Sequence, residues 1–368
     1  MDLRHTETRR PTLIALLRAV HEAPDTVGEI LKGVVDRPSA WEELTLWADH
    51  EGVLGVVGPL LLADSGLPGA VRAAIERHRA VQDLWQGHLL RGLEAAVTAL
   101  SNAGVRSCAL KGPALAARLY PDGATRPSLD VDLLTDAGDL DQSVATLAGL
   151  GYRAETGPTA DYLRRYGHHL HLAAPGSAPI ELHFRAYSGF GIVLPAEVLL
   201  DRARRFEFPD GFAVLVPCPE DEFLYLAIHA AGHSFSRLLW LNDLQRLVRR
   251  YPGLDWDRVF RVASRMGIAF AVAYVATLLS HWFSISIPDH GCRSRLGVRG
   301  RAADWLLPIV SRPSEPSTRD AAESLVFTSL LCDRTRSAAW LLQHHALRAT
   351  RRRLHGFAPR LAPADWAA

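Results

Sequence analysis

Two acidic residues two positions apart, Asp130 and Asp132, occur in the segment LDVDLL. Residues two apart in a β-strand point to the same face, so a strand here places both carboxylates side by side. Leu129, Val131 and Leu133 then face the other way. Two anions this close repel each other, and Mg²⁺ relieves the repulsion by accepting two carboxylates together with substrate phosphates. The pattern therefore predicts a metal site that handles phosphate groups, and the alternative is a solvated edge strand.

Further residues of suitable chemistry precede and follow the acidic pair. Lys111 and Gly112 end a short apolar strand upstream, and Glu181 lies in the alternating segment IELHF downstream. Lys111 and Arg126 are candidates to bind phosphate, lysine as a compact charge and arginine as a bidentate fork. The alternatives are a lysine at a strand end and an arginine in a loop.

The order of glycine turn, paired acids and later acid resembles the nucleotidyltransferase superfamily of DNA polymerase β. More closely, LKGPALAARLYPDGATRPSLDVDLL, GLGY and IELHF, with H-x3-H and a later WLNDL, resemble a bacterial family of uncharacterised nucleotidyltransferases. The resemblance runs from about Leu93 to Leu247. It implies that Asp130, Asp132 and Glu181 bind Mg²⁺ (or Mn²⁺) and that Glu181 helps to deprotonate and orient the attacking hydroxyl.

The glycine turn departs from the pattern of this superfamily. Its usual turn has serine after the glycine and a shorter gap to the acids, whereas here Pro113 follows Gly112 and 18 positions separate Gly112 from Asp130. Proline offers neither a hydroxyl nor an N–H group to a phosphate. We therefore expect Lys111, Arg126 and the Gly112 backbone to border the nucleotide.

Histidines gather near Glu181. His183 lies two residues beyond Glu181 and shares its strand face, where it either contacts the nucleotide or supports the site by hydrogen bonding. The preceding strand carries His168, His169 and His171, of which His169 and His171 share one face, and this cluster leaves a transition-metal site as an alternative.

A second pair, His229 and His233, lies four apart on a predicted helix and hence on one face. The sequence HAAGH is superficially similar to the zinc-peptidase motif HExxH, but position 230 is alanine, so the general base is missing. A zinc hydrolase is one alternative function. The family resemblance implies instead that this face, with Asp243, closes over the nucleotide or supports the sheet.

The spacing at which apolar residues recur changes along the chain, and it predicts the helices and strands that must position these residues. Apolar positions recur at three and four residues in the first hundred positions and again after Pro219, which predicts helices. Between them RSCALKG, LDVDLLT, HHLHLAA and IELHF alternate as strands, PALAARLY and DLDQSVATLAGLG are helical, and Asp139 is the expected cap of the second helix. The predicted fold class is α+β, a small mixed β-sheet nucleotidyltransferase core flanked by N-terminal and C-terminal helical regions. The boundaries are 1–104 for the N-terminal helical region, 105–217 for the core and 218–368 for the C-terminal helical region.

The amino-acid composition limits the classes of partner that we expect for this protein. The 368 residues are 48% hydrophobic, enough for a substantial core, and 41 basic residues nearly cancel 40 acidic ones. No overall field draws the molecule to nucleic acid or to an anionic membrane, so a small-molecule or protein acceptor is favoured over nucleic acid. Only Lys32 and Lys111 are lysines, which fits the codon bias of a GC-rich bacterium and draws attention to Lys111.

The remaining composition predicts a cytoplasmic protein. The cysteines are far apart, which argues against a disulfide framework or a zinc knuckle; they are Cys108, Cys218, Cys292 and Cys332. The first twenty residues do not resemble a signal peptide, and no apolar run is long enough to span a membrane.

The resemblance implies an enzyme that transfers a nucleoside monophosphate from a nucleoside triphosphate to a hydroxyl or phosphate acceptor by divalent-metal catalysis. The alternative is a catalytically inactive nucleotidyltransferase-like module that binds nucleotide or protein. We expect the carboxylates of Asp130, Asp132 and Glu181 to approach within roughly 5 Å of one another. We also expect either aspartate-to-asparagine change to abolish transfer and to stabilise the metal-free protein slightly, because one of two repelling charges is gone.

Overall fold

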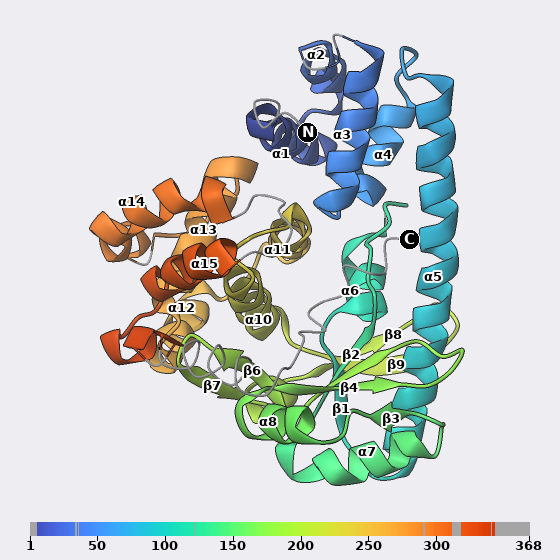
Figure 1. Ribbon diagram of the computed structural model, residues 1–368, viewed down its shortest axis with the longest axis vertical. Helices are drawn as coiled ribbons and strands as arrows, with labels where there is room; N and C mark the ends of the chain where they lie inside the picture. Colours follow the sequence, from blue (N-terminus) through green and yellow to red (C-terminus); the bar gives the residue numbers. More distant parts are fainter. Residues whose placement is uncertain are drawn as a thin grey trace.

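The computed structural model describes residues 6–33, 35, 37–121, 123–289, 291–310, 318–339 and 341–342. Its first hundred positions, where described, are largely helical, as predicted. The elements of this region are α1 (Thr6–Glu22), η2 (Pro24–Thr26), α2 (Val27–Lys32), α3 (Pro38–His50), α4 (Leu54–Leu62) and α5 (Gly69–Asn102). The 34-residue helix α5 runs along one side of the molecule, from the N-terminal helices to the sheet (Figure 1). Pro68 precedes its first residue, and Gly104, at φ +77°, follows its end.

A mixed seven-stranded sheet forms the predicted core. Its strands are β1 (Ser107–Ala109), β2 (Val131–Thr135), β3 (Arg153–Ala154), β4 (His169–Ala173), β5 (Ile180–His183), β8 (Arg204–Glu207) and β9 (Ala213–Val216). They lie in the order β3-β4-β5-β2-β1-β9-β8, with β2–β5 and β1–β9 parallel and the other neighbours antiparallel. The predicted strands β1, β2, β4 and β5 thus occupy the middle of the sheet.

The two faces of the sheet have different chemistry. Val131 and Leu133 of β2 are buried in one apolar cluster with the C-terminal half of α5. A Cβ atom at Gly92 of α5 would lie 2.7 Å from the Cβ of Ala178, so the helix packs closely on this face. Asp132, between the two apolar residues, necessarily faces the opposite side, toward the helices that follow residue 218.

The core contains α6 (Gly112–Leu119), η3 (Ala137–Asp139), α7 (Leu140–Ala148) and α8 (Pro158–Tyr166). Asp139 is the N-cap residue of α7, as predicted, but its side chain makes no capping hydrogen bond. The short turn η3 precedes α7, and there Asp136 accepts a hydrogen bond from the Gly138 N–H at 2.8 Å. The side-chain cap is therefore one turn earlier than the sequence suggested.

The described residues of the C-terminal region are largely helical, as predicted, and a small sheet that the sequence did not predict lies at the end of the core, before them. The helices of this region are α10 (Pro219–Gly232), α11 (Leu238–Arg250), α12 (Trp256–Met266), α13 (Ala269–Phe283), α14 (Cys292–Val310) and α15 (Thr318–Leu330). A two-stranded sheet precedes them and consists of β6 (Arg185–Gly189) and β7 (Ile192–Pro195), followed by α9 (Glu197–Leu200). The sequence predicts helix over residues 320–355. Helix α15 covers the start of this range and ends at Leu330, and residues 343–355, with the Arg351–Arg353 run, lie outside the described residues.

Buried ion pairs join the C-terminal helices to the core. Arg118 of α6 donates to both carboxylate oxygens of Glu222 of α10, one of them at 2.8 Å, and both side chains are at least 95% buried.

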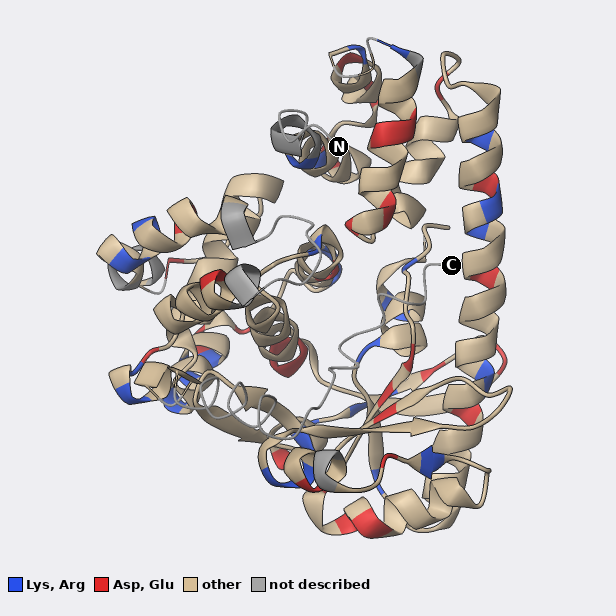
Figure 2. Ribbon diagram, in the orientation of Figure 1, with Lys and Arg blue, Asp and Glu red and all other residues tan. Residues whose placement is uncertain are grey.

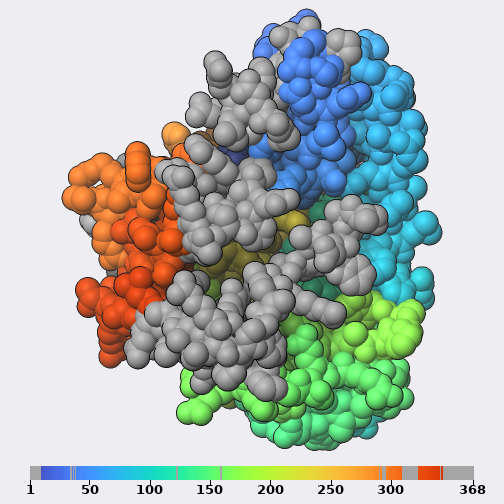
Figure 3. Space-filling view, viewed as in Figure 1, coloured from blue at the N-terminus to red at the C-terminus, as the bar shows by residue number. Residues whose placement is uncertain are grey.

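In the space-filling view the N-terminal helices lie above the sheet region and the orange C-terminal helices lie to one side of both (Figure 3). Acidic and basic residues are interspersed over the described elements (Figure 2). No helix of the described part is both long and apolar enough to cross a bilayer.

Candidate active site

Asp132 and Glu181 lie side by side at the centre of the sheet. Strands β2 and β5 are parallel, and Asp132 is the direct register partner of Glu181. Across the antiparallel pair of β4 and β5, His171 is opposite Glu181 and His169 is opposite His183. Alternation along each strand places these five side chains on the face away from α5.

Lys111 supplies the positive charge of this face. Its Nζ atom is 3.1 Å from Asp132 Oδ1, and its side chain is 13% exposed, against 2% for Asp132. The turn after β1 brings it there: Gly112 has φ +63°, and a Cβ at that position would lie 3.1 Å from the Asp130 carbonyl oxygen. Glycine is required because it accepts this left-handed conformation and leaves room for the backbone of Asp130.

His183 connects the two acids. Its Nε2 atom is 3.2 Å from Asp132 Oδ1 and 3.6 Å from Glu181 Oε2, and the side chain is 2% exposed. Burial alone would lower the pKa of His183, but the hydrogen bond with Asp132 and the charges of both carboxylates raise it above its usual value. The Nδ1 atom is buried, and the described residues offer it no hydrogen-bond partner. His183 therefore holds Asp132 and Glu181 in place.

Negative charge exceeds positive charge in the site. Burial, together with the neighbouring charges of Asp132 and Glu181, raises the pKa of Asp130 to about 7. Burial would also raise the pKa of Glu181, but the hydrogen bond from His183 and the charges around it hold that pKa below its usual value. Burial would lower the pKa of Lys111, and the attraction of Asp132 raises it instead. Three carboxylates thus share this face with two cationic groups, Lys111 and His183, an imbalance that suits a further cation.

The ligand atoms present fit a divalent metal ion. Among the described residues, one ligand atom each from Asp132, Glu181 and His183 all lie within 4.8 Å of one another. Asp130 precedes β2 and joins no such group, although its charge acts on the same residues. A second group, formed by His169, His171 and Glu181, meets the same distance limit, so the transition-metal alternative has a geometric counterpart.

Arg126 has a different set of contacts from the one we expected. Its guanidinium forms a bidentate pair with Asp243 of α11, with Nε to Oδ1 and Nη2 to Oδ2 both at 2.8 Å. The remaining nitrogen donates to Ser128 Oγ at 2.7 Å. The residue is only 4% exposed, and Tyr120 Oη donates to the same carboxylate at 2.6 Å. In this arrangement Arg126 fastens the segment before Asp130 to α11 instead of facing a phosphate.

The long gap between Gly112 and Asp130 is filled by α6 and a loop that several helices hold. Gln86 of α5 donates to the Arg126 carbonyl at 2.7 Å, and Trp85 donates to the Ser128 carbonyl at 2.9 Å. The Thr125 N–H donates to the Gly55 carbonyl of α4 at 3.0 Å. The N-terminal helices and α11 therefore position the loop that delivers Asp130.

Helix α10 presents one line of side chains toward the acids. Tyr225, His229 and His233 are four apart and share a face of the helix and its last turn. Burial, followed by the charge of Lys111, lowers the pKa of His229. His233, which follows the last residue of the helix, is exposed. The described residues give these two histidines no third metal ligand, so the zinc-hydrolase alternative has no structural support.

Tyr225 was not singled out in the sequence. It is 1% exposed, and its hydroxyl has no hydrogen-bond partner among the described residues. Burial raises its pKa above the usual range, and the charges that act on it are Lys111, Asp132, Glu181 and Asp130. Its position one turn before His229 was the available signal. A buried, unpaired hydroxyl beside this set of charges is available to a ligand.

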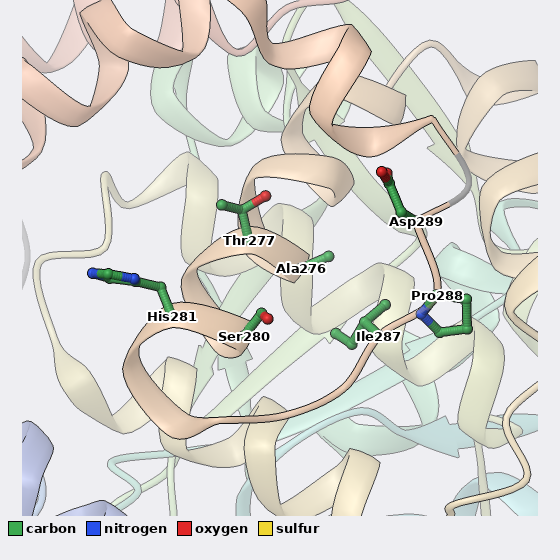
Figure 4. Close-up of a pocket in the computed structure, with 7 residues that line it drawn as sticks. All are labelled: Ala276, Thr277, Ser280, His281, Ile287, Pro288 and Asp289. Atoms are coloured by element: carbon green, nitrogen blue, oxygen red, sulfur yellow. The ribbon is translucent and has the colours of Figure 1, made fainter.

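A cavity of about 330 Å³ lies elsewhere, between α13 and the segment that follows it (Figure 4). It is lined by Ala276, Thr277, Ser280, His281, Ile287, Pro288 and Asp289. These seven residues include no lysine, no arginine and only one carboxylate, so the cavity lacks the groups that bind a metal–triphosphate. The chemistry therefore favours the sheet face over this cavity.

The sheet, its acidic pair and the buried lysine are the features expected of a nucleotidyltransferase core. The chain belongs to a family of uncharacterised nucleotidyltransferases, whose model matches residues 37–284. The match confirms the resemblance and extends it at both ends, to include α3 to α5 before the sheet and α12 and α13 after it. No curated protein matches the chain.

Proposed function

We propose that this protein transfers a nucleoside monophosphate from a nucleoside triphosphate to a hydroxyl or phosphate acceptor. The observation that carries the proposal is the direct pairing of Asp132 with Glu181, beside buried Lys111, in a member of a nucleotidyltransferase family.

Asp132 and Glu181, with Asp130 next to them, would hold Mg²⁺ or Mn²⁺. Carboxylate oxygens are the ligands that these hard cations prefer, and the excess negative charge of the face favours their binding. The bound cation would supply charge neutralisation at the α-phosphate. His183 Nε2, in contact with both acids, keeps their carboxylates oriented in the absence of substrate.

The protein groups then have separate tasks. Lys111 binds a phosphate oxygen as a compact charge. Glu181 accepts the proton of the acceptor hydroxyl, whose oxygen forms a bond to the α-phosphorus. The bond from the α-phosphorus to the oxygen that bridges to the β-phosphate breaks, and pyrophosphate leaves.

The test is to incubate the purified protein with each α-labelled nucleoside triphosphate, Mg²⁺ or Mn²⁺, and a lysate. Stable label on a protein or small molecule, lost in Asp132→Asn, is the expected result. Asp210→Asn is a matched control, because Asp210 is exposed in the turn between β8 and β9 and caps only that turn. Nucleotide binding without any transfer of label would favour the inactive binding module.

A further inference from the structure

We propose that Trp240, together with His233 and His229, forms the surface on which the nucleobase of the substrate stacks. This inference rests on the proposed function. It assigns a binding surface to the nucleobase, the end of the nucleotide that lies farthest from the acidic residues.

The three rings form one aromatic cluster at the junction of α10 and α11. The centroids of His233 and Trp240 are 4.9 Å apart with the planes tilted by 36°. His229 lies 4.7 Å from His233 and meets Trp240 edge-on at 5.4 Å. Two helices thus contribute to a single aromatic patch.

The cluster is accessible, unlike the two leucines that flank Trp240. Leu239 and Leu241, on either side of Trp240, are 4% and 0% exposed and belong to the apolar core. Trp240 is only half-buried, and His233 is exposed. A tryptophan that served only to fill the core would be covered like its neighbours, so its accessible ring is available to a flat ligand.

The patch is at a suitable position for the base of a nucleotide whose phosphates lie at the acids. The charge of Lys111 acts on both His229 and His233, and the charge of Glu181 acts on His233. Trp240 lies three positions before Asp243, whose carboxylate holds Arg126 and with it the loop that delivers Asp130. The buried pair of Arg126 and Asp243 therefore links the helix that carries Trp240 to the loop that carries Asp130.

Tyr225 offers a further contact for the nucleotide, between the phosphate end and the base end. Tyr225 is 99% buried, and its hydroxyl has no hydrogen-bond partner among the described residues. It lies on the same face of α10 as His229. A ribose or phosphate oxygen would satisfy the hydroxyl. The line from Lys111 through Tyr225 to Trp240 thus offers a cation, a hydroxyl and an aromatic ring to the phosphate, sugar and base in turn.

Stacking predicts how the base is recognised. Every base has a π-face, so a ring platform binds bases with little regard to their hydrogen-bonding edges. Loss of a stacked aromatic side chain weakens binding of a base by on the order of tenfold or more.

The experiment compares Trp240→Ala and Trp240→Phe with wild type by calorimetric titration of Mg²⁺ complexes of a nucleoside triphosphate and of inorganic tripolyphosphate. We expect Trp240→Ala to weaken nucleoside triphosphate binding by on the order of tenfold or more and to leave tripolyphosphate binding unchanged. Trp240→Phe keeps a ring and should stay within about threefold of wild type. Trp305→Ala is the control, because Trp305 of α14 is 72% exposed and belongs to a different surface.

The outcomes separate this inference from the proposed function. Wild-type protein that binds tripolyphosphate as tightly as the nucleoside triphosphate would overturn the stacking surface and leave the phosphate site intact. Equal loss of both ligands in Trp240→Ala, with Trp240→Phe equally affected, would also overturn it. Wild-type protein that binds neither ligand would overturn the proposed function itself. If Trp240→Ala fails to fold, the comparison of nucleoside triphosphate with tripolyphosphate on the wild-type protein can still overturn the inference.

Discussion

Lys111 Nζ and Asp132 Oδ1 are 3.1 Å apart, and both side chains are largely buried. The ammonium group of Lys111 therefore pairs with a carboxylate that was expected to bind a metal ion. This pairing separates the two aspartates of the LDVDLL segment. Asp132 is stabilised by its neighbours, whereas Asp130 is repelled by them. Both were expected to behave alike, since the sequence shows only their spacing.

The first prediction is that the two asparagine variants have opposite effects on metal-free stability. Asp132→Asn leaves Lys111 buried without its counter-charge, and we expect a loss of about 1 to 3 kcal/mol. Asp130→Asn removes a repelled carboxylate, and we expect a gain on the order of 1 kcal/mol above pH 7, where the wild-type group is ionised. Urea unfolding at pH 8 without divalent ions measures both changes.

Both variants should nevertheless lose nucleotidyl transfer and the stabilisation given by Mg²⁺-nucleotide. Equal stability changes of the same sign would contradict the pairing of Lys111 with Asp132. The Asp210→Asn protein should match wild type in each measurement.

The second prediction concerns the positive charge. Lys111→Met keeps most of the side-chain volume but removes the ammonium group, so triphosphate binding should weaken by about 1.5 to 3 kcal/mol. Lys32→Met is the matched control, since Lys32 is the only other lysine and is exposed. Calorimetric titration gives the affinities. Unchanged binding in Lys111→Met would remove this residue from the phosphate site.

The third prediction treats Arg126 as a positioning residue. Removal of one partner of its buried pair with Asp243 should destabilise the protein by about 3 to 5 kcal/mol. If the residue acted only on phosphate, Arg126→Ala would weaken nucleotide binding and leave stability almost unchanged. A cycle of Arg126→Met, Asp243→Leu and the double variant, followed by denaturant unfolding, distinguishes these cases. The double variant should recover much of the stability lost in either single one.

The fourth prediction concerns the glycine turn. Gly112→Ala places a Cβ 3.1 Å from the Asp130 carbonyl oxygen, on a residue whose φ is +63°. We expect a cost of about 1 to 3 kcal/mol and a displaced acidic loop. Gly123→Ala is the control for the backbone term, because φ is +77° there and the added Cβ contacts nothing within 4 Å. Transfer activity should fall in Gly112→Ala and persist in Gly123→Ala.

The local pattern was enough to predict the central strands and their polar face. Alternation in LDVDLL and IELHF identified β2 and β5, and the three acids were read from the same alternation. Strand β8 was not predicted because, at the sheet edge, Arg204–Glu207 are mostly exposed and polar and lack an alternating apolar face. The tip FPDG of its hairpin with β9 was the available turn signal.

Contacts between segments that are far apart in the sequence could not be predicted. Arg126 was expected to bind phosphate because nothing local reveals that Asp243, more than a hundred positions later, accepts its guanidinium. Tyr225 was overlooked because a tyrosine in an apolar helix resembles any core residue until its hydroxyl is seen to be unpaired. Such partners are determined by how the helices pack on the sheet, which periodicity does not encode.

Helix α5 has a consequence for how the protein can be divided. Its early residues Val71 and Ile75 pack among the N-terminal helices, whereas Leu89 and Leu93 cover the apolar back of the sheet. A fragment that began at residue 105 would expose that back to water and release the loop that Trp85 and Gln86 hold. Recombinant truncations should therefore aggregate unless they retain all 34 residues of α5.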